Sequence, residues 1–341
     1  MRKDFACIVI SHGRPECSTV NVLRECGYTG EIYIVVDDED KTLPDYAERY
    51  GAVKTMRNKN FAVFILSHGR ANNIKTVNML KRFHYTGDWY VVIDNEDDQE
   101  ELYRNEFGDH IIQFDKRDYV SKIDLGDMDT DRRVGVFARN FIQDEAERLG
   151  YECHLQLDDD FSEISIRYAD DDKLQSMMVT DLDTVFDACL DLFLSTPLTA
   201  LSFALSSDYI GGVANDRFQA GMFRKTMGSF FLKAKDKVKF VMRMNDDITS
   251  CVLYGSRGKL FYSISSLQVI TPATQRDAGG MTDIYKKNGT YRKSFYSVMC
   301  CPSFVKVSAM GITDFRIHHE ISWNNAVPKL LSERWCKHER H

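Results

Sequence analysis

The chain has 341 residues, of which 44 are Lys or Arg and 51 are Asp or Glu, so its formal net charge is −7. This length allows one large domain or two modest ones, and the acidic balance excludes a basic face over the whole protein, although it allows a local basic patch. No apolar run approaches the roughly 18 residues that a membrane span needs, and we expect no secretory leader. The nine cysteines include no C-x-x-C pair, so we expect reduced thiols in a cytoplasmic protein.

An internal repeat opens the chain. Residues 4–40 read DFACIVISHGRPECSTVNVLRECGYTGEIYIVVDDED, and residues 60–97 read NFAVFILSHGRANNIKTVNMLKRFHYTGDWYVVIDNED. Each copy predicts a strand, an SHGR loop, a helix, a YTG turn and a second strand that ends in acids, at Asp37–Asp40 and Asp94–Asp97. The strands are nearly continuous apolar runs, as in a sheet covered on both faces. The sequence therefore predicts two copies of a βαβ unit.

The second copy leads directly into further α/β structure. We predict a helix over Asp97–Phe107, a strand over His110–Phe114 and a helix over Arg133–Leu149. The first copy is followed only by a short basic link, Gly51–Lys59. We therefore predict an accessory unit at residues 1–57 and a working domain at 58–341. The pattern is that of an α/β fold with a mostly parallel sheet flanked by helices.

Two interpretations of the second SHGR loop are open. A glycine-bearing loop between a strand and a helix can be no more than a tight turn. However, Arg70 at the carboxyl end of a strand can meet a phosphate or a base, and Asp94 at the end of the next strand can accept hydrogen bonds from a base or ribose.

An acidic strand end follows in the stretch Tyr151–Phe161, YECHLQLDDDF. Its apolar run ends in Asp158, Asp159 and Asp160, so the strand would deliver three carboxylates to the edge of the sheet. Adjacent carboxylates repel each other unless a cation lies among them, and oxygen ligands suit Mg²⁺ or Mn²⁺, which also bind phosphates. The alternative is a solvated acidic turn.

The preceding helix favours the functional interpretation. Its apolar positions follow helical spacing across Arg133–Leu149, and Gly150 stands where a helix commonly stops. Arg139 and Asn140 lie within it, so a basic group and an amide would approach the same edge as the acids. A diphosphate bridged by a metal ion needs both an arginine fork and a cation.

Past the acids, we expect a helix over Leu182–Leu194 and strands over Thr199–Leu205, Phe230–Leu232 and Leu260–Ile270. Asp246 and Asp247 open a further helix, where they fit either a helix start with favourable charge or a general base facing an acceptor. The stretch Pro272–Tyr296 is rich in Gly, Lys, Arg and Tyr, and predicts a flexible loop suited to phosphate or an unstacked base.

A histidine pair, His318-His319, follows Arg316 near the end of the chain. Mn²⁺ accepts an imidazole ligand, whereas Mg²⁺ prefers oxygen throughout. Because neighbouring side chains of a strand point to opposite faces, only one of the two histidines can reach a site. We predict His318 as that ligand, against the alternative that both histidines fill a carboxyl-terminal core.

These motifs, in this order, carry a resemblance to a known family. The motifs of this chain resemble those of the phage TET-associated glycosyltransferases; they are SHGR, TV, YTG, VIDNED, ARN, LQLDDDF, NDD, PSFVKV and RIHH. The order of parts is similar to that of GT-A nucleotide-sugar glycosyltransferases. The resemblance covers about residues 58–328, and the duplicated unit at 1–57 departs from the family's pattern. It implies a GT-A-like (Rossmann-like) fold and transfer of a sugar from a nucleotide-sugar, a UDP-sugar, to a hydroxymethylated pyrimidine of phage DNA, in the bacterial cytoplasm.

The resemblance also implies roles for single residues. The nucleoside of the donor would be held by Ser67, Arg70, Asp94 and Asn95, and the ribose or diphosphate by Arg139 and Asn140. A Mn²⁺ or Mg²⁺ ion would be bound by Asp158 and Asp160, with Asp158 also contacting the nucleotide. Asp247, or its neighbour Asp246, would be the catalytic base. The nucleotide-sugar half would comprise residues 58–165 and the acceptor half residues 166–341.

Two other functions fit the same pattern. The first is transfer to a glycan or protein acceptor by the same chemistry. The second is a nucleotide-binding scaffold without turnover, a role that the duplicated unit would suit. Stereochemistry is a separate question, because inverting and retaining enzymes can share this fold and metal site; we expect inversion.

Overall fold

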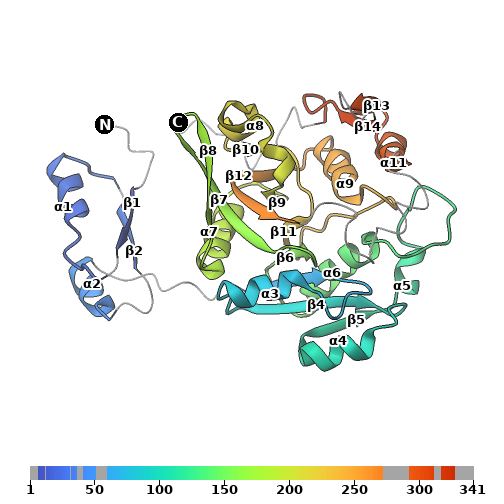
Figure 1. The fold of residues 1–341 in the computed structure, drawn as a ribbon, viewed down its shortest axis with the longest axis horizontal. Helices are drawn as coiled ribbons and strands as arrows, with labels where there is room; N and C mark the ends of the chain where they lie inside the picture. The colour runs from blue at the N-terminus through green and yellow to red at the C-terminus, as the bar shows by residue number, and fades with distance from the viewer. Residues whose placement is uncertain are drawn as a thin grey trace, which may run out of the picture. The chain divides into compact units, whose positions relative to one another are not determined.

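The structure of this protein, a computed structural model, describes residues 7–11, 13–30, 32–36, 41–50, 60–271, 292–310 and 316–326. The chain divides into two compact units, Met1–Asn58 and Lys59–His341 (Figure 1). Each unit has a hydrophobic core of its own.

The first unit contains two strands and two helices. They are β1 (Cys7–Ser11), α1 (Ser18–Glu25), β2 (Ile32–Val36) and α2 (Leu43–Tyr50). β1 and β2 pair in parallel, and a small core of Val9, Cys17, Val20 and Tyr46 lies between the sheet and the helices. The predicted βαβ unit is therefore found in the first copy. Its acidic end, Asp37–Asp40, and the link Gly51–Lys59 lie outside the described residues.

The second unit is built on one mixed sheet. Among the described residues the sheet has ten strands in the order β5-β4-β3-β6-β11-β9-β12-β7-β8, with β10 paired to β12 off this path. The strands are β3 (Phe61–Leu66), β4 (Asp88–Asp94), β5 (Ile111–Phe114), β6 (Cys153–Asp158), β7 (Glu163–Asp170), β8 (Lys173–Met178), β9 (Ala200–Ala204), β10 (Met222–Phe223), β11 (Ser229–Lys233) and β12 (Phe261–Ile270). A separate two-stranded sheet consists of β13 (Val305–Met310) and β14 (Arg316–Ile321).

Helices cover both faces of the large sheet. They are α3 (Lys75–Arg82), α4 (Glu100–Phe107), α5 (Arg117–Val120), α6 (Val136–Arg148), α7 (Leu182–Ser195), α8 (Asp216–Gln219), α9 (Asp246–Gly255) and α11 (Arg292–Cys300). Consecutive side chains of β3 alternate between the faces, because Val63 and Ile65 join the core with α3 and α7, whereas Phe64 joins the core with α6. The predicted α/β fold is confirmed.

The parallel part of the sheet positions the site. β5, β4, β3 and β6 all run in the same direction, and Leu66 at the end of β3 lies opposite Val92 of β4 and Asp158 of β6. The carboxyl ends of these strands therefore meet at one edge, which carries Ser67, Asp94 and Asp158. From β11 onward antiparallel strands join the sheet, although β12 is again parallel to β9.

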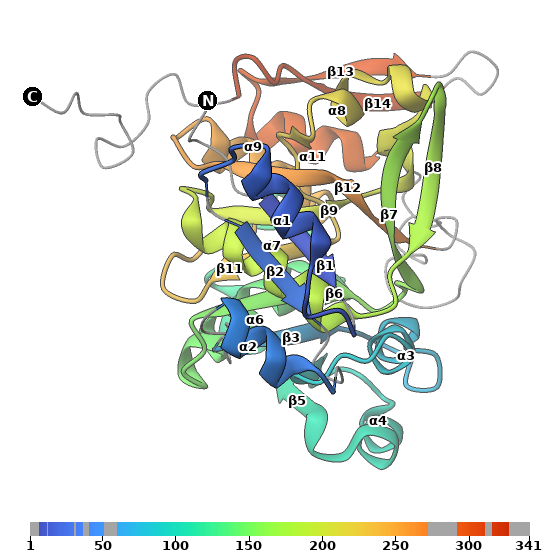
Figure 2. The ribbon, with the colours of Figure 1, turned by 90° about the vertical axis from the view of Figure 1, so that its left-hand side faces the viewer.

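The sequence pattern does not predict the hairpin of β7 and β8. These strands pair antiparallel and form a long ribbon at one end of the sheet (Figure 2). The residues of β8 are exposed or half-buried, so this strand lacks the apolar alternation that marks a half-buried strand. Asp171 takes a positive φ of 50° in the connecting turn, a conformation that Asp tolerates better than most residues.

The predicted loop over Pro272–Tyr296 is wrong at its end, because α11 begins at Arg292. This helix buries Ser294, Tyr296 and Ser297, a face of small and aromatic side chains that composition alone does not distinguish from a loop. The residues from 272 to 291 lie outside the described part of the chain. The other predicted helices and strands are found, with ends shifted by a few residues.

Candidate active site

A threonine of α3 fixes the acidic turn that follows β6. The hydroxyl of Thr76 donates to the carbonyl oxygen of Asp158 at 2.5 Å and accepts the N–H of Phe161 at 3.0 Å. The Thr76 N–H donates to the carbonyl oxygen of Asp159 at 3.2 Å. Thr76 is fully buried, so these bonds satisfy the backbone of the turn without water and set the direction of its carboxylates.

Asp159, the middle acid, holds two residues that the sequence predicts as nucleoside contacts. Ser67 Oγ donates to Asp159 Oδ2 at 2.6 Å, and Arg70 Nη1 donates to Asp159 Oδ1 at 2.6 Å. The hydroxyl of Tyr103 lies 2.9 Å from Ser67 Oγ and accepts the Arg70 N–H at 2.9 Å. Burial raises the pKa of Asp159, although Arg70 and Ser67 oppose the shift. Ser67 and Arg70 thus reach the predicted edge, where they anchor the SHGR loop to the acidic turn.

Arg139 of α6 joins the acid at the end of β6 to an acid of α9. Its Nη2 donates to Asp158 Oδ1 at 2.8 Å, and its Nε donates to Asp246 Oδ2 at 3.1 Å. The guanidinium carbon lies 4.9 Å from the ring centroid of Phe230, which adds a cation–π contact. The Arg139 side chain is only 6% exposed, and among the described residues its buried Nη1 has no hydrogen-bond partner. Arg139 therefore lies at the predicted edge with carboxylates as its partners.

The carboxylates of this cluster have raised pKa values. Burial, followed by repulsion from Asp158 and Asp159, raises the pKa of Asp160 to about 7. Burial raises the pKa of Asp246 to about 7 and also raises that of Asp158, although Arg139 opposes both shifts. A cation among these carboxylates would relieve their repulsion.

The residues of the acidic turn fit a divalent ion that protein and substrate hold together. The described part of the chain contains no group of three His, Cys, Asp or Glu side chains that could hold a metal ion by itself. Asp158 and Asp160 nevertheless offer the oxygen donors that Mg²⁺ and Mn²⁺ bind. Mg²⁺ in particular keeps several waters and takes substrate phosphates as further ligands, so two protein carboxylates are enough.

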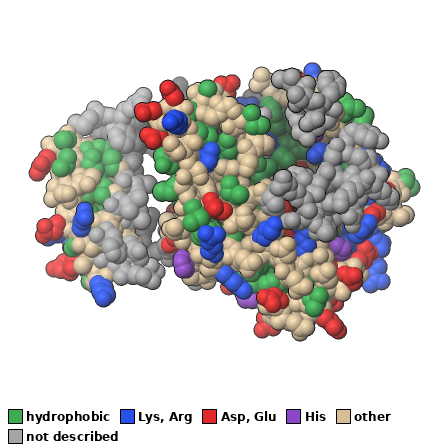
Figure 3. Space-filling model, in the orientation of Figure 1, with side chains coloured by type: hydrophobic (Ala, Val, Ile, Leu, Met, Phe, Trp, Pro, Cys, Tyr) green, Lys and Arg blue, Asp and Glu red, His purple; other side chains and the backbone are tan. Residues whose placement is uncertain are grey.

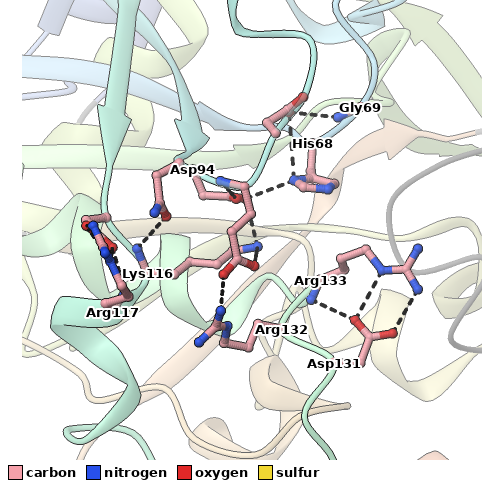
Figure 4. A network of polar contacts seen from close by, with 12 residues as sticks. His68, Gly69, Asp94, Lys116, Arg117, Asp131, Arg132 and Arg133 are labelled. Atoms are coloured by element: carbon pink, nitrogen blue, oxygen red, sulfur yellow. Dashed lines mark hydrogen bonds and ion pairs between the residues drawn. The ribbon is translucent and has the colours of Figure 1, made fainter.

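Asp94 lies at the centre of a second polar network, at the end of β4 (Figure 4). Its Oδ2 is 2.9 Å from His68 Nδ1 and 3.0 Å from Lys116 Nζ, and its Oδ1 accepts the Glu96 N–H at 2.9 Å. Burial alone would raise the pKa of Asp94, but the hydrogen bond from His68 and the charge of Lys116 lower it. The sequence pattern does not single out Lys116, whose only signal is its place just after the end of β5.

The two predicted asparagines bond to the backbone. Asn95 Oδ1 accepts the Lys116 N–H at 3.0 Å. Asn140 Nδ2 donates to the carbonyl oxygens of Val136 at 2.8 Å and Phe240 at 2.9 Å. The predicted contacts of Asn95 and Asn140 with a donor therefore stay predictions.

The second acidic pair lies in the first turn of α9. Asp246 and Asp247 are its first two residues, where the helix dipole favours negative charge, and Asn245 is its N-cap. Asp246 faces Arg139, whereas Asp247 Oδ1 accepts the Ile248 N–H at 2.6 Å. The structural interpretation of the pair therefore applies, and the role of Asp247 as a base stays a prediction.

His319 lies against the start of α9. His319 Nδ1 is 3.2 Å from Asn245 Nδ2, and burial, with smaller contributions from nearby positive charge, lowers the pKa of His319 to about 4. Contrary to the expectation that neighbouring side chains of a strand point to opposite faces, the two imidazole rings lie close together, with the ring centroid of His319 4.3 Å from that of His318. The predicted role of His318 as a metal ligand stays a prediction, and the side chain of Arg316 lies outside the described part of the structure.

Comparison with known proteins identifies the family. The model of the TET-associated glycosyltransferase family matches residues 61–280, which is more than half of the chain. The chain belongs to the TET-associated glycosyltransferase family. No curated protein matches this glycosyltransferase.

Several solved structures are similar to this glycosyltransferase. One is glucosyl-3-phosphoglycerate synthase from Mycobacterium tuberculosis in complex with Mg²⁺ and uridine-diphosphate, with 8% identity over 77% of this chain and 88% of that chain and a TM-score of 0.43. The same synthase with Mn²⁺, uridine-diphosphate and phosphoglyceric acid has 7% identity over 77% of this chain and 87% of that chain and a TM-score of 0.40. A further structure of a mycobacterial protein has 8% identity over 77% and 84% and a TM-score of 0.41.

The surface and helices of this glycosyltransferase add two observations. On the face shown in Figure 3, Lys and Arg side chains are interspersed with Asp and Glu side chains. Within the described residues, no helix combines the length and the apolar character that crossing a membrane requires.

Proposed function

We propose that this enzyme transfers a sugar from a UDP-sugar to the hydroxyl group of a hydroxymethylated pyrimidine in phage DNA, in the cytoplasm of the bacterial host. The observation that carries the proposal is the link, through Arg139, between Asp158 at the end of a parallel strand and Asp246 at the start of α9. Arg139 would thereby hold a donor-side acid and an acceptor-side acid in fixed positions. Transfer between two bound substrates requires such an arrangement.

On the donor side, Asp158 and Asp160 would hold a Mn²⁺ or Mg²⁺ ion together with the diphosphate of the UDP-sugar. The ion, when bound, would neutralise charge that develops on the leaving diphosphate. Asp159 anchors Ser67 and Arg70, and this loop would face the nucleotide. If the ion is Mn²⁺, His318 is the imidazole that we propose as a further ligand.

On the acceptor side, Asp247 would act as the general base. The hydroxymethyl oxygen attacks the anomeric carbon of the sugar, and a new carbon–oxygen bond forms while the bond to the diphosphate oxygen breaks. Asp247 takes the proton that the hydroxyl loses. Asp246 is engaged in the ion pair with Arg139, and we therefore assign the proton transfer to its neighbour. A single displacement of this kind inverts the anomeric centre.

The test measures release of UDP from UDP-sugars in the presence of Mn²⁺. Three reactions are compared: a DNA duplex that contains hydroxymethylcytosine, the same duplex with cytosine, and no acceptor. We expect release that requires the hydroxymethyl group, and an increase in the mass of the DNA by one sugar residue. Release that requires a glycan or protein acceptor instead, or binding of UDP without turnover on any acceptor, would overturn the assignment to DNA.

The chain offers a matched control for the metal-binding acids. Asp160→Asn should abolish the Mn²⁺-dependent release. Asp171→Asn changes the central acid of a second Asp triplet, Asp170–Asp172, which lies exposed at the β7–β8 turn. This control should turn over as the natural chain does. Equal activity of the two variants would show that the acidic turn is not part of the donor site.

A further inference from the structure

We propose that His68 contacts the nucleoside of the donor, and that Asp94 and Lys116 are positioning residues that set the orientation and charge of His68. This inference rests on the proposed function, because it assigns a residue within the same donor site. It also changes the role of Asp94, which the resemblance implies as a direct nucleoside contact.

Asp94 has little capacity left for a ligand. Its Oδ1 accepts the Glu96 N–H at 2.9 Å, and its Oδ2 is shared by His68 at 2.9 Å and Lys116 at 3.0 Å. Asp94 is buried, and Lys116 is only 2% exposed. A carboxylate whose two oxygens are both engaged by protein donors serves better to orient another group than to bind a substrate.

His68 is the exposed end of this network. It directly follows Ser67 at the carboxyl edge of β3, and its side chain is 25% exposed. The loop is held on both sides of it, because Ser67 bonds to Asp159 and the Gly69 N–H donates to Asp97 Oδ2 at 2.8 Å. The hydrogen bond from His68 Nδ1 to Asp94 fixes the orientation of the ring, so that Nε2, the other ring nitrogen, is the one that would contact a ligand. A rigid loop thus presents one imidazole nitrogen at the edge where the nucleotide would bind.

The charges around His68 favour a neutral nucleoside over a phosphate. Asp94 and Asp97 face the imidazole, with Lys116 as the nearby cation, and Lys116 in turn also contacts Glu96. Arg132 pairs with Glu96 on the outer side of this network (Figure 4). A diphosphate here would be repelled by this group of carboxylates, whereas an uncharged base would not be repelled.

The same groups set the charge of His68. The hydrogen bond with Asp94 is the largest influence and raises the pKa of His68, while burial and the charge of Lys116 oppose the shift and Asp97 adds to it. The protonated ring presents Nε2–H as a donor, and the carbonyl oxygens of uracil are matching acceptors.

The experiment uses uridine as the probe, because it has no phosphate that titrates. Its affinity for the full-length protein is measured from pH 5 to pH 9, and the pKa of His68 is followed by NMR with and without uridine. We expect affinity to fall as the pH rises through the pKa of His68. Asp94→Asn should move this fall to lower pH, and Lys116→Met should move it to higher pH. A purely structural role for the two residues would not produce opposite shifts.

Substitution of the histidine itself gives the second measurement. His68→Gln should weaken the binding of both uridine and UDP by about ten- to a hundredfold, the usual worth of a hydrogen bond to a charged group. The control is His110→Gln, because His110 precedes β5 and so lies at the opposite edge of the parallel strands. This control should bind both ligands as the natural chain does.

Three outcomes would overturn the inference. In the first, His68→Gln binds uridine normally. In the second, it loses affinity for UDP alone, which would assign the contact to phosphate. In the third, Asp94→Asn and Lys116→Met leave the pH profile unmoved or shift it in the same direction. Failure of the proposed function is distinguishable, because it would be seen in the natural chain, which would then not release UDP in response to hydroxymethylated DNA, whereas these three outcomes are seen in the variants.

Discussion

Removal of Arg139 should destabilise the protein by a predictable amount. Arg139→Met keeps an apolar chain beside the Phe230 ring but deletes the ion pairs to Asp158 at 2.8 Å and to Asp246 at 3.1 Å. Removing one partner of a buried ion pair costs about 3–5 kcal/mol, because the other charge is left uncompensated. The side chain of Asp158 is 35% exposed, so solvent screens part of this loss. We therefore expect the free energy of unfolding to fall by about 3 kcal/mol.

The loss should increase with pH. A carboxyl group whose pKa is higher in the folded state than in the unfolded state binds more protons when folded, so stability decreases as the pH rises between the two values. For Asp246 this interval extends from about 4 in the unfolded chain to about 7 in the folded chain. Arg139 lowers the pKa of Asp246 and Asp158, so its removal extends the interval upward. Arg139→Met should therefore cost more at pH 8 than at pH 5.

Urea unfolding, followed by circular dichroism in the presence of EDTA, measures this difference without a bound metal ion. Arg104→Met is the control, because Arg104 is 48% exposed and pairs at the surface with Glu100, which is itself 39% exposed. This control variant should lose less than about 1 kcal/mol of its free energy of unfolding at both pH values. A cost for Arg139→Met below about 1 kcal/mol, or an equal cost at pH 5 and pH 8, would refute the electrostatic role assigned to Arg139.

Three further tests have defined outcomes. Asp247→Asn should slow transfer by about 10²–10⁴-fold with UDP affinity unchanged, since a general base acts only on the acceptor proton; normal turnover would place the base elsewhere. Thr76→Val keeps the volume but removes the hydroxyl that holds the acidic turn, so urea unfolding should show a loss of about 1–3 kcal/mol, and an unchanged midpoint would contradict this account. For the metal site, we expect His318→Ala to reduce the Mn²⁺-dependent activity. If both His318→Ala and His319→Ala retained this activity while Asp160→Ala lost it, the metal site would be confined to the acids.

The location of the candidate site could be proposed from the sequence because it depends on strand ends. The apolar runs before Ser67, Asp94 and Asp158 predict buried strands, and parallel strands of a covered sheet bring their carboxyl ends to one edge. This argument needs only the period of the hydrophobic pattern and the direction of the chain. Both are local properties, so the edge could be assigned without knowledge of any side-chain contact.

The partners within the site could not be predicted in the same way. Asp159 accepts hydrogen bonds from Ser67 and Arg70, and Asp94 forms an ion pair with Lys116. Each of these pairs joins residues from different strands or loops, and its geometry depends on how those segments pack. A chain with several acids and several basic residues at one edge allows many pairings, and only the packed structure selects among them.

Tyr103 is an exception, because the repeat contains a signal for it. Tyr46 and Tyr103 lie 57 residues apart, the same separation that relates the two TVN segments. In the first unit, the Tyr46 hydroxyl lies 2.7 Å from Ser11 Oγ and accepts the Arg14 N–H at 2.9 Å. The corresponding distances around Tyr103 are 2.9 Å and 2.9 Å. The repeat therefore extends past the acidic strand end, and each copy carries the tyrosine that shapes its own SHGR loop.

The two copies together separate what the loop forms by itself from what the sheet adds. Ser11 and its tyrosine reproduce the arrangement of Ser67 in a unit whose described residues contain two strands, β1 and β2. The loop geometry is therefore a local property of the repeat. In the second unit, β6 pairs with β3 and delivers Asp159 to Ser67 and to Arg70. In the second unit this third strand brings the acids to Arg70, which is why we place the catalytic site in the second copy.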